Sequence, residues 1–188
     1  MTRESADGTL SHVNGCDIRP AAPEDLPALV RSLGQEEYFT VSLKRQDAGH
    51  GFLLVAWQRG VAVGDVYVWL APAEEPELRT HLRGVALITH LEVVPRLRNL
   101  GIGTKLLRAA EDSLYAAGRK RVALGVRLDN DDAQRLYKRQ GYEEWPHGEV
   151  ATTAVVYHAD GSREVLPEVC RIMVRRLEED RPGRWGTS

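Results

Sequence analysis

The sequence predicts an α/β domain in which helices flank a central mixed sheet, on the border between the α/β and α+β classes. Its 188 residues are close to the usual size of one domain. The middle portion alternates strand, helix and strand, as parallel pairing requires, whereas strands follow one another directly at the front and the back, which favours antiparallel pairing. We therefore expect one domain over residues 16–178, with flexible segments at 1–15 and 179–188.

The front half predicts two helices between a first strand and a hairpin. Pro23 suits the first position of a helix, and Gly34 suits the position just after its end. The dipeptide Arg59-Gly60 is typical of a tight turn between paired strands. In order, the expected elements are a strand at 16–19, helices at 23–33 and 36–48, strands at 52–58 and 61–71, and a polar loop at 72–84.

The second half predicts a long strand, two strand–helix units and a final set of strands. Pro95 stops the long apolar strand, and Gly118 closes the helix that follows it. The turn Asp160-Gly161 separates the last two strands. In order, the expected elements are a strand at 85–94, a helix at 104–117, a strand at 121–128, a helix at 131–140, and strands at 141–145, 150–158 and 168–177.

Composition and charge argue against several classes of partner. The chain has 25 basic and 27 acidic side chains and a net charge of −2, which gives no long-range field for nucleic acid or an anionic membrane. Cys16 and Cys170 lack CxxC spacing and the histidines are not clustered, so we expect neither a metal site nor a disulfide scaffold. No apolar run approaches the length of a membrane span, and the polar start lacks the apolar core of a signal peptide. We therefore expect a cytoplasmic protein.

A glycine-bearing turn between a strand and a helix predicts an anion site at Arg98–Gly103. The first turn of a helix has unpaired N–H groups and a partial positive charge. Gly101 and Gly103 lack Cβ atoms, so phosphate oxygens can come close to the backbone. Asn99 is one of the few non-glycine residue types that tolerate a positive φ. Arginines in the same turn add formal charge.

Two common phosphate-binding motifs do not fit this stretch. A Walker A motif needs four residues between its glycines and then Gly-Lys-Ser/Thr, and a dinucleotide fingerprint needs a third glycine where Leu106 stands. The order Leu-x-Val-x-Pro followed by Arg-x-x-Gly-x-Gly instead resembles the acetyl-CoA motif of the GNAT acetyltransferase superfamily. For this motif alone, a glycine-rich turn that merely joins a strand to a helix remains the alternative.

A second motif strengthens the resemblance. Residues 130–142 are similar to the superfamily segment Asn-x-x-Ala-x-x-Leu-Tyr-x-x-x-Gly-Phe/Tyr, and they follow the first motif after one helix and one strand, as in that family. Ile18-Arg19-Pro20 and the helix after it match the usual start of the family. The resemblance is strongest over residues 87–145 and implies a GNAT-like acyl-CoA N-acyltransferase fold.

The resemblance implies an enzyme that uses acetyl-CoA as acyl-donor co-substrate, without a metal. It also implies that the strands before Pro95 and around Val126 separate, so that unpaired backbone groups of Val93 and Val94 bind the pantetheine arm. The N–H of Val93 would then point at the thioester oxygen. The residues that the resemblance assigns to acetyl-CoA are Val93, Val94, Arg98, Asn99, Leu100, Gly101, Ile102, Gly103, Thr104, Asn130, Tyr137 and Arg139.

Two side chains are candidates for acid–base chemistry. By resemblance, Tyr137 protonates the departing CoA thiolate, because a phenol with a pKa of about 10 is protonated at neutral pH. An aromatic residue on an apolar helix face can equally belong to the core. Strand alternation puts Glu92 on one face with His90 and Val94. Glu92 is then a candidate base for the amine, a salt-bridge partner, or a charge that attracts a cationic amine.

Other candidates have a structural interpretation beside the functional one. We expect His90 to be packed or hydrogen-bonded. Asn130 suits the N-cap of the helix at 131–140, which is compatible with a contact to the CoA arm. Lys138 and Arg139 can meet the CoA phosphates or stay solvated at the surface.

The leading hypothesis is an N-acetyltransferase that acts on a primary amine of a small molecule or peptide, with O-acylation or a longer acyl chain as variants. A non-catalytic acyl-CoA sensor would keep the glycine loop and lose the acid–base residues. A nucleotide-dependent enzyme would bind ATP or NAD. The acceptor has no motif, and we expect residues 34–51, 72–84 and the hairpin-like insertion 146–167 to shape its site. The insertion is also a candidate dimer interface, since many members of the family are homodimers.

Overall fold

The computed structural model of the chain describes residues 15–158 and 162–177. The turn expected at Asp160-Gly161 and nearly all of the two terminal segments expected to be flexible lie outside the described residues. In chain order, the elements are β1 (Asp17–Pro20), a 3-10 turn (Pro23–Asp25), α1 (Leu26–Leu33), α2 (Glu36–Asp47), β2 (Gly51–Gln58), β3 (Val61–Trp69), α3 (Pro76–His81), β4 (Ala86–Val93), a second 3-10 turn (Pro95–Leu97), α4 (Ile102–Ala116), β5 (Arg121–Arg127), α5 (Asp131–Arg139), β6 (Glu143–Tyr157) and β7 (Arg163–Arg176).

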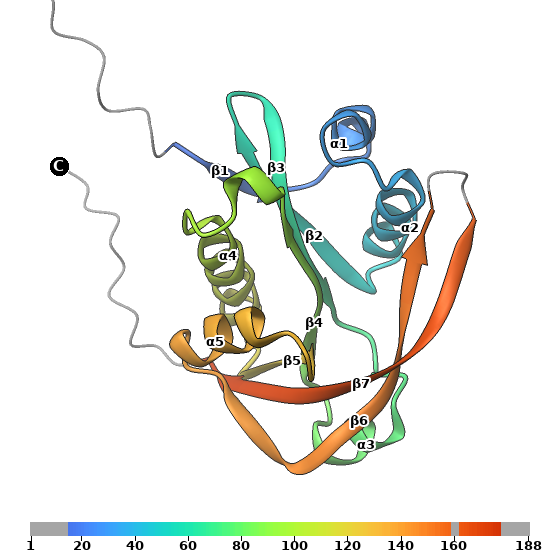
Figure 1. Cartoon of the computed structure of the whole chain (residues 1–188), viewed down its shortest axis with the longest axis vertical. Coiled ribbons are helices and arrows are strands. Elements are labelled where there is room, and N and C mark those ends of the chain that lie inside the picture. The colour runs from blue at the N-terminus through green and yellow to red at the C-terminus, as the bar shows by residue number, and fades with distance from the viewer. Residues whose placement is uncertain (1–14, 159–161, 178–188) are drawn as a thin grey trace, which may run out of the picture.

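A mixed sheet organises the described residues (Figure 1). Its seven strands have the order β1-β2-β3-β4-β5-β7-β6. β4 and β5 pair in parallel, and every other pair of neighbours is antiparallel. The mixed sheet expected from the sequence is therefore confirmed. Its parallel pair belongs to the strand–helix–strand unit in the middle of the chain, where the helix makes the crossover that parallel strands need.

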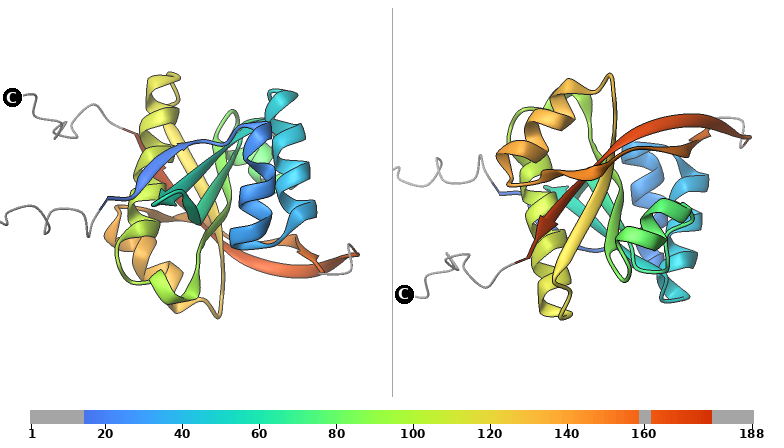
Figure 2. Two further views of the ribbon diagram at one scale, coloured as in Figure 1. Left: turned by 90° about the horizontal axis from the view of Figure 1, so that it is seen from above. Right: turned by 90° about the horizontal axis from the view of Figure 1, so that it is seen from below.

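Helices cover both faces of this sheet (Figure 2). α1 and α2 pack on one face, where Leu29 and Phe39 are fully buried against side chains of β2 and β3. α4 packs on the other face. Its residues Leu106, Ala110 and Leu114 recur every four positions and are fully buried, which is the pattern of a helix with one apolar side. The sheet thus separates the apolar cluster under α4 from the one under α1 and α2, and a third cluster forms around α3.

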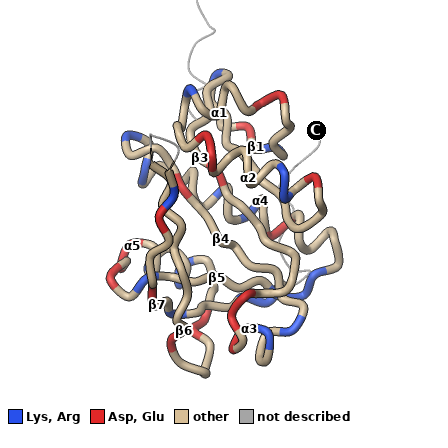
Figure 3. The backbone as a smooth tube through the Cα atoms, turned by 90° about the vertical axis from the view of Figure 1, so that its right-hand side faces the viewer, with Lys and Arg blue, Asp and Glu red and all other residues tan. Residues whose placement is uncertain are grey.

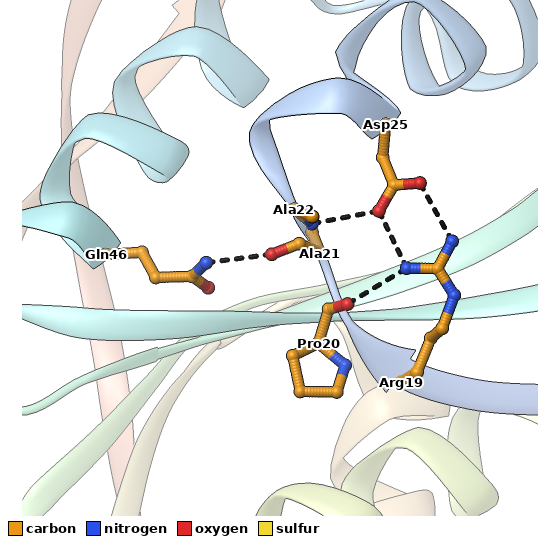
Figure 4. Close-up of polar contacts among 6 residues, drawn as sticks. All are labelled: Arg19, Pro20, Ala21, Ala22, Asp25 and Gln46. Atoms are coloured by element: carbon orange, nitrogen blue, oxygen red, sulfur yellow. Dashed lines mark hydrogen bonds and ion pairs between the residues drawn. The ribbon is translucent and has the colours of Figure 1, made fainter.

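A hydrogen-bonded junction fixes α1 and α2 to the edge of the sheet (Figure 4). Arg19 of β1 makes a bidentate ion pair with Asp25, at 2.7 and 2.8 Å, and this hydrogen-bonded guanidinium lowers the pKa of Asp25. The Asp25 carboxylate also accepts the N–H of Ala22 at 2.9 Å. Gln46 of α2 donates to the carbonyl of Ala21 at 2.8 Å. The connection between β1 and α1 is therefore held at a defined position beside α2.

Two expectations about the elements are wrong. The polar stretch 72–84 contains α3, because Pro76 starts a short helix whose Leu78, together with Leu82, is buried under the far end of the sheet. The strands expected at 141–145 and 150–158 form one strand, β6, with an irregularity between Glu144 and Glu149. β6 lies at the edge of the sheet, where Pro146 can be accommodated because no ladder hydrogen bond needs its nitrogen. Its partner β7 also starts earlier than expected.

Strands β4 and β5 pair over only part of their length. Register pairs join Ala86, Leu87 and Ile88 of β4 to Val122, Ala123 and Leu124 of β5, and none joins the residues beyond them. β4 nevertheless continues to Val93 on β3, and β5 continues to Arg127 on β7. The two central strands therefore separate toward their carboxyl ends, as the resemblance implied.

Acidic and basic residues are interspersed along the chain, as Figure 3 shows for the side that it draws. This agrees with the net charge of −2. Within the described part of the chain, none of the helices is both long enough and apolar enough to cross a bilayer.

Candidate active site

The turn between β4 and α4 adopts the backbone conformation that an anion site needs. Asn99 has φ 62°, in agreement with its residue type, and Gly101 has φ 83° and is left-handed as well. The first helical hydrogen bond runs from the N–H of Lys105 to the carbonyl of Gly101 at 3.0 Å, and no side chain caps this end of α4. The N–H groups of Ile102, Gly103 and Thr104 therefore have no acceptor within the helix. Together with the helix dipole, they make this end of α4 suited to a phosphate.

Packing within the protein does not explain why residue 103 is a glycine. A Cβ atom there would lie 3.8 Å from Val93 Cγ2 and 3.9 Å from Leu136 Cδ2, which are ordinary contacts. Its φ is not positive, so neither packing nor backbone conformation demands glycine. A ligand that approaches the backbone closely would give a reason for it.

Arg98 ties the turn to the end of β4. Its Nε donates to the carbonyl of Val93 at 3.0 Å, and its guanidinium lies 3.8 Å from the Glu92 carboxylate. The sequence predicted that Arg98 adds charge to the turn and, by resemblance, binds acetyl-CoA, but it gave no sign of this bond to the end of β4. The neighbouring Arg96 is exposed and lies beside the pocket described below.

The backbone at the end of β4 presents one free donor to the gap beside β5. The N–H of Val94 bonds to the carbonyl of Val63 at 3.0 Å, and this bond makes Val93 and Gly64 a non-hydrogen-bonded pair. The N–H and C=O of Val93 therefore point away from β3, toward the side where β5 has separated. The carbonyl accepts from Arg98, and the N–H faces no strand partner among the described residues.

The expectation that Val94 also has unpaired backbone groups is wrong. Its N–H bonds to β3, and its carbonyl accepts the N–H of Leu97 at 2.9 Å. Pro95 starts a 3-10 turn immediately after β4, and this turn pairs the carbonyl of Val94, while β3 pairs its N–H. Only Val93 keeps a donor for a ligand here.

Tyr137 lies on the buried face of α5, beside the same strand end. It is 8% exposed and belongs to the apolar cluster that contains Val93 and Val126. Burial raises its pKa to about 12. Its hydroxyl has no hydrogen-bond partner in the part of the chain that the structure describes. The phenol is therefore protonated at neutral pH, and both interpretations, core residue and acid, fit its position.

The start of α5 confirms the structural interpretation of Asn130. The Asn130 side chain accepts the N–H of Ala133 at 3.1 Å, so Asn130 is the N-cap that the sequence predicted. At the other end, Lys138 and Arg139 are exposed. The structure leaves their contact with CoA a prediction.

A pocket of about 390 Å³ lies on the other side of the end of β4. Its lining comes from the end of α1 with Gln35, from Gly64 and Asp65 of β3, and from the segment of Glu92 to Arg96. Of the three segments expected to shape the acceptor site, 34–51 contributes Gln35. The other two contact each other, because Thr152 donates to Glu75 at 2.7 Å.

Glu92 projects into this pocket and is partly exposed. Gln35 donates to its Oε2 at 3.0 Å, and His90 Nε2 lies 3.7 Å from the same oxygen. His90 and Glu92 share a face of β4, as strand alternation predicted. The structure therefore supports the view that Glu92 is an accessible carboxylate that other groups hold in place.

A row of polar side chains behind Glu92 was not apparent in the sequence. Asp65 is 2% exposed and accepts the Tyr38 hydroxyl at 2.8 Å. His90 Nε2 lies 3.4 Å from the same carboxylate oxygen. One signal could have drawn attention to Asp65, since it is the only charged residue in the apolar strand β3. The described residues include no group of His, Cys, Asp or Glu that could hold a metal ion.

Comparisons with known proteins agree with this geometry. A family profile described as the acetyltransferase (GNAT) family matches residues 18–142, more than half of the chain. An uncharacterized N-acetyltransferase of Methanocaldococcus jannaschii is 34% identical over 110 residues, which cover 57% of this chain and 44% of that protein. An aminoalkylphosphonate N-acetyltransferase of Salmonella typhimurium is 34% identical over 64 residues, 34% of this chain and 42% of that protein. The chain thus spans less than half the length of these two relatives.

Solved structures show the same fold. The ribosomal-protein-S18-alanine N-acetyltransferase of Escherichia coli superposes with a TM-score of 0.61 at 19% identity, over 92% of this chain and 100% of that one. The PaiA N-acetyltransferase of Thermoplasma acidophilum, solved in complex with coenzyme A, superposes with a TM-score of 0.59 at 16% identity, over 86% of this chain and 99% of that one. At these identities the likeness concerns the fold alone.

Proposed function

The chain belongs to the GNAT acetyltransferase family, and from that premise we propose that it transfers the acetyl group of acetyl-CoA to a primary amine of a small molecule or peptide, by direct attack in a ternary complex. The observation that carries the proposal is the end of β4. Its Val93 N–H faces the gap beside β5, and its Glu92 side chain faces the pocket on the other side. A donor in the gap and an acceptor in the pocket would meet at this strand end.

In this proposal the donor binds along the gap with its pyrophosphate on the first turn of α4. The free N–H groups of residues 102–104 and the space over Gly103 support this placement. The pantetheine arm would pass the Val93 N–H and reach the face of α5 that carries Tyr137. The remaining donor-binding residues in the proposal are Arg98, Asn99, Leu100 and Gly101 in the turn, and Asn130 and Arg139 on α5.

The chemistry needs a neutral amine, a stabilised oxyanion and a protonated leaving group. The amine nitrogen forms a bond to the thioester carbon, and the Val93 N–H stabilises the negative oxygen that results. Glu92 removes a proton from the amine nitrogen. The C–S bond then breaks, the sulfur takes a proton from Tyr137, and solvent reprotonates the phenol. The pKa of about 12 keeps Tyr137 protonated before the step.

The pocket suits acceptors of limited size that carry an amine. Asp65 and Glu92 offer negative charge, and Arg96 lies on the same lining. An acidic group beyond the amine is therefore compatible with the site, and the Salmonella relative is named for an acceptor of that kind. An assay panel should include simple alkylamines, amino acids, aminoalkyl acids and short peptides.

The proposal is tested by release of free thiol from acetyl-CoA with this panel, for the wild type and Tyr137→Phe. Phenylalanine keeps the packing and removes a hydroxyl that has no partner within the described chain, so folding should be unaffected. We expect turnover to fall by about 10²–10⁴-fold, the usual contribution of a general acid, with CoA affinity nearly unchanged. Tyr115→Phe on α4 is the matched control and should behave as wild type.

Two outcomes would contradict the proposal. Tight CoA binding without thiol release for any amine would indicate a sensor of acyl-CoA. Thermal stabilisation by ATP or NAD but not by CoA would indicate a nucleotide-dependent protein.

A further inference from the structure

Asp65 is a buried carboxylate in the middle of the sheet. It is 2% exposed in a strand whose other side chains are apolar or small. Burial of a charged group is strongly unfavourable unless it is paired and hydrogen-bonded. Two partners meet it, the Tyr38 hydroxyl at 2.8 Å and His90 Nε2 at 3.4 Å. Asp65 is one of the residues that line the pocket, whereas His90 is not.

His90 holds one nitrogen between two carboxylates. Its Nε2 is buried and lies 3.4 Å from Asp65 and 3.7 Å from Glu92, and it makes a well-aligned hydrogen bond to no described residue. The Tyr38 ring packs on the imidazole with 4.4 Å between ring centroids. This packing limits the movement of the imidazole, and the unsatisfied nitrogen needs an explanation.

The surroundings of His90 favour its charged form. Burial lowers the pKa of His90, but the Asp65 carboxylate and then Glu92 raise it by more, so the pKa lies above its usual value of 6.5. The groups that face this cluster from the elements around it are Asp65 and Tyr67 on β3, Tyr38 on α2, Glu92 on β4, Arg98 beyond Glu92, and Tyr157 of β6 beyond Tyr38. Two carboxylates therefore face the imidazole directly, and no arginine or lysine does so among the described contacts.

We propose that the pocket binds the acceptor as a primary ammonium ion between Asp65 and Glu92, and that His90, held against Asp65, receives through Glu92 the proton that the amine loses. The inference rests on the proposed function and identifies the protonation state in which the acceptor binds. Asp65 and Glu92 supply two negative charges to the pocket lining and Arg96 one positive charge, so negative charge prevails, which favours a cation. His90 lies behind them and acts through Glu92, so it is a positioning residue for the proton path.

The protons balance over one turnover. The ammonium gives its first proton to Glu92, which passes it to Nε2 of neutral His90, and the imidazolium pairs with Asp65. The neutral amine attacks the thioester carbon, and the nitrogen then gives a second proton to the free Glu92 carboxylate. Tyr137 protonates the leaving sulfur and is reprotonated from solvent. His90 and Glu92 release their two protons to solvent, so one proton is released in net terms for each acetyl group transferred.

This proton path makes kcat/KM depend on pH in two ways. Neutral His90 is needed to accept the proton, so kcat/KM should fall as pH drops through the raised pKa of the cluster. The acceptor must bind as a cation, so kcat/KM should also fall as pH rises through the pKa of the amine itself. Two acceptors with different amine pKa values should therefore share the acidic limb and differ in the basic limb.

The first test compares pH profiles of kcat/KM for wild type, His90→Gln and Asp65→Asn with these two acceptors. We expect His90→Gln to lower the plateau about tenfold and to move the acidic limb to lower pH, because Glu92 then acts alone. Asp65→Asn should also move that limb to lower pH, because the charge that raises the pKa of His90 is gone. His81→Gln, a histidine stacked on His147 away from the pocket, is the matched control and should keep the wild-type profile.

A second measurement does not need activity. In the isotope-labelled protein, the NMR titration of the His90 ring should give a pKa above 6.5 in wild type and a lower one in Asp65→Asn. An unshifted or depressed His90 pKa in wild type, or an acidic limb that follows the amine instead of the enzyme, would overturn the inference.

The two proposals fail in different ways. If wild type transfers acetyl groups and His90→Gln keeps the wild-type pH profile, the inference is wrong and the proposed function stands. If wild type transfers to no amine, the proposed function is wrong, and the NMR titration still decides whether His90 and Asp65 form the pair.

Discussion

The glycine turn and the polar pocket lie on opposite sides of the end of β4 and are built in different ways. The turn comes from one continuous stretch, Arg98–Gly103, and presents mainly backbone N–H groups. The pocket takes Gln35 from the α1–α2 connection, Asp65 from β3 and Glu92 from β4, and presents side chains. Backbone N–H groups can bind the phosphates of a donor that many proteins use. Recognition of one particular acceptor instead requires side chains from several elements.

One strand serves both regions because its residues alternate. Val93 turns its N–H toward the gap beside β5, while the preceding residue, Glu92, turns its side chain toward the pocket. Any change that affects only one region should therefore separate donor binding from acceptor use.

Glu92→Gln should separate the two regions most strongly. It keeps the shape of the side chain and removes the base, so turnover with the best amine should fall by about 10²–10⁴-fold. CoA affinity, measured by calorimetry, should stay within about twofold, because Glu92 reaches the donor side only through a partly exposed ion pair with Arg98 at 3.8 Å. Glu143→Gln, at an exposed position of β6, is the control. An equal loss of CoA affinity would show that Glu92 belongs to the donor region.

Gly64→Ala should damage the pocket through the backbone. A Cβ atom at this position would lie 2.6 Å from the Glu92 carbonyl oxygen and 3.2 Å from Val93 Cα, so β3 and β4 would have to move apart. We expect a loss of about 1–3 kcal/mol in the free energy of unfolding, by chemical denaturation, and a raised KM for the amine.

Gly51→Ala is the matched control for this substitution, since its Cβ would lie 2.2 Å from the Val68 carbonyl oxygen, at the opposite end of β3. It should destabilise the protein without a selective effect on the amine. If both variants changed KM alike, the effect at Gly64 would be one of general stability.

Gly103→Ala should damage only the donor side. The added Cβ makes ordinary contacts within the protein, so unfolding free energy should be unchanged or higher by up to about 1 kcal/mol, as for glycine replaced in a helix. CoA should bind at least about tenfold more weakly, because the Cβ occupies the space over the helix end. Gly101→Ala is the contrast, since its φ of 83° should make alanine destabilising by about 1 kcal/mol. Unchanged CoA affinity in Gly103→Ala would place the phosphates elsewhere.

Asn99→Gly should have the smallest effect. Asn99 already has φ 62°, so glycine relieves a modest strain and the change in unfolding free energy should stay within about 0.5 kcal/mol. CoA affinity should stay within about twofold if the turn contributes through its backbone. A larger loss of affinity would show that the Asn99 side chain itself contacts the donor.

The glycine turn could be predicted from sequence because its signals are local. A strand end, two glycines and a helix start lie within one short stretch, and the second motif fixes α5 relative to it. The N-cap role of Asn130 and the left-handed conformations of Asn99 and Gly101 also depend on neighbouring residues only. The error at Val94 arose because its N–H is bonded to Val63, a residue of another strand.

The polar pocket was not predictable in the same way. Tyr38, Asp65 and His90 meet through the register of β3 with β4 and the packing of α2 on the sheet. The sequence also divided β6 near Pro146. The ladder with β7 does have a gap there, between Glu144 and Glu149, but pairing with β7 on both sides of the gap keeps β6 one strand.

Local signals in the sequence predicted most of the elements, the mixed sheet and the glycine turn at the start of α4, because periodicity, turn residues and helix ends depend on neighbours along the chain. Contacts in the folded protein were needed to find α3, the extent to which β4 and β5 separate, the backbone groups of Val93 and Val94 that stay free, and the side chains that surround Glu92. These depend on strand register and helix packing, where residues far apart in the chain come into contact and a shift of one position would turn each side chain to the opposite face.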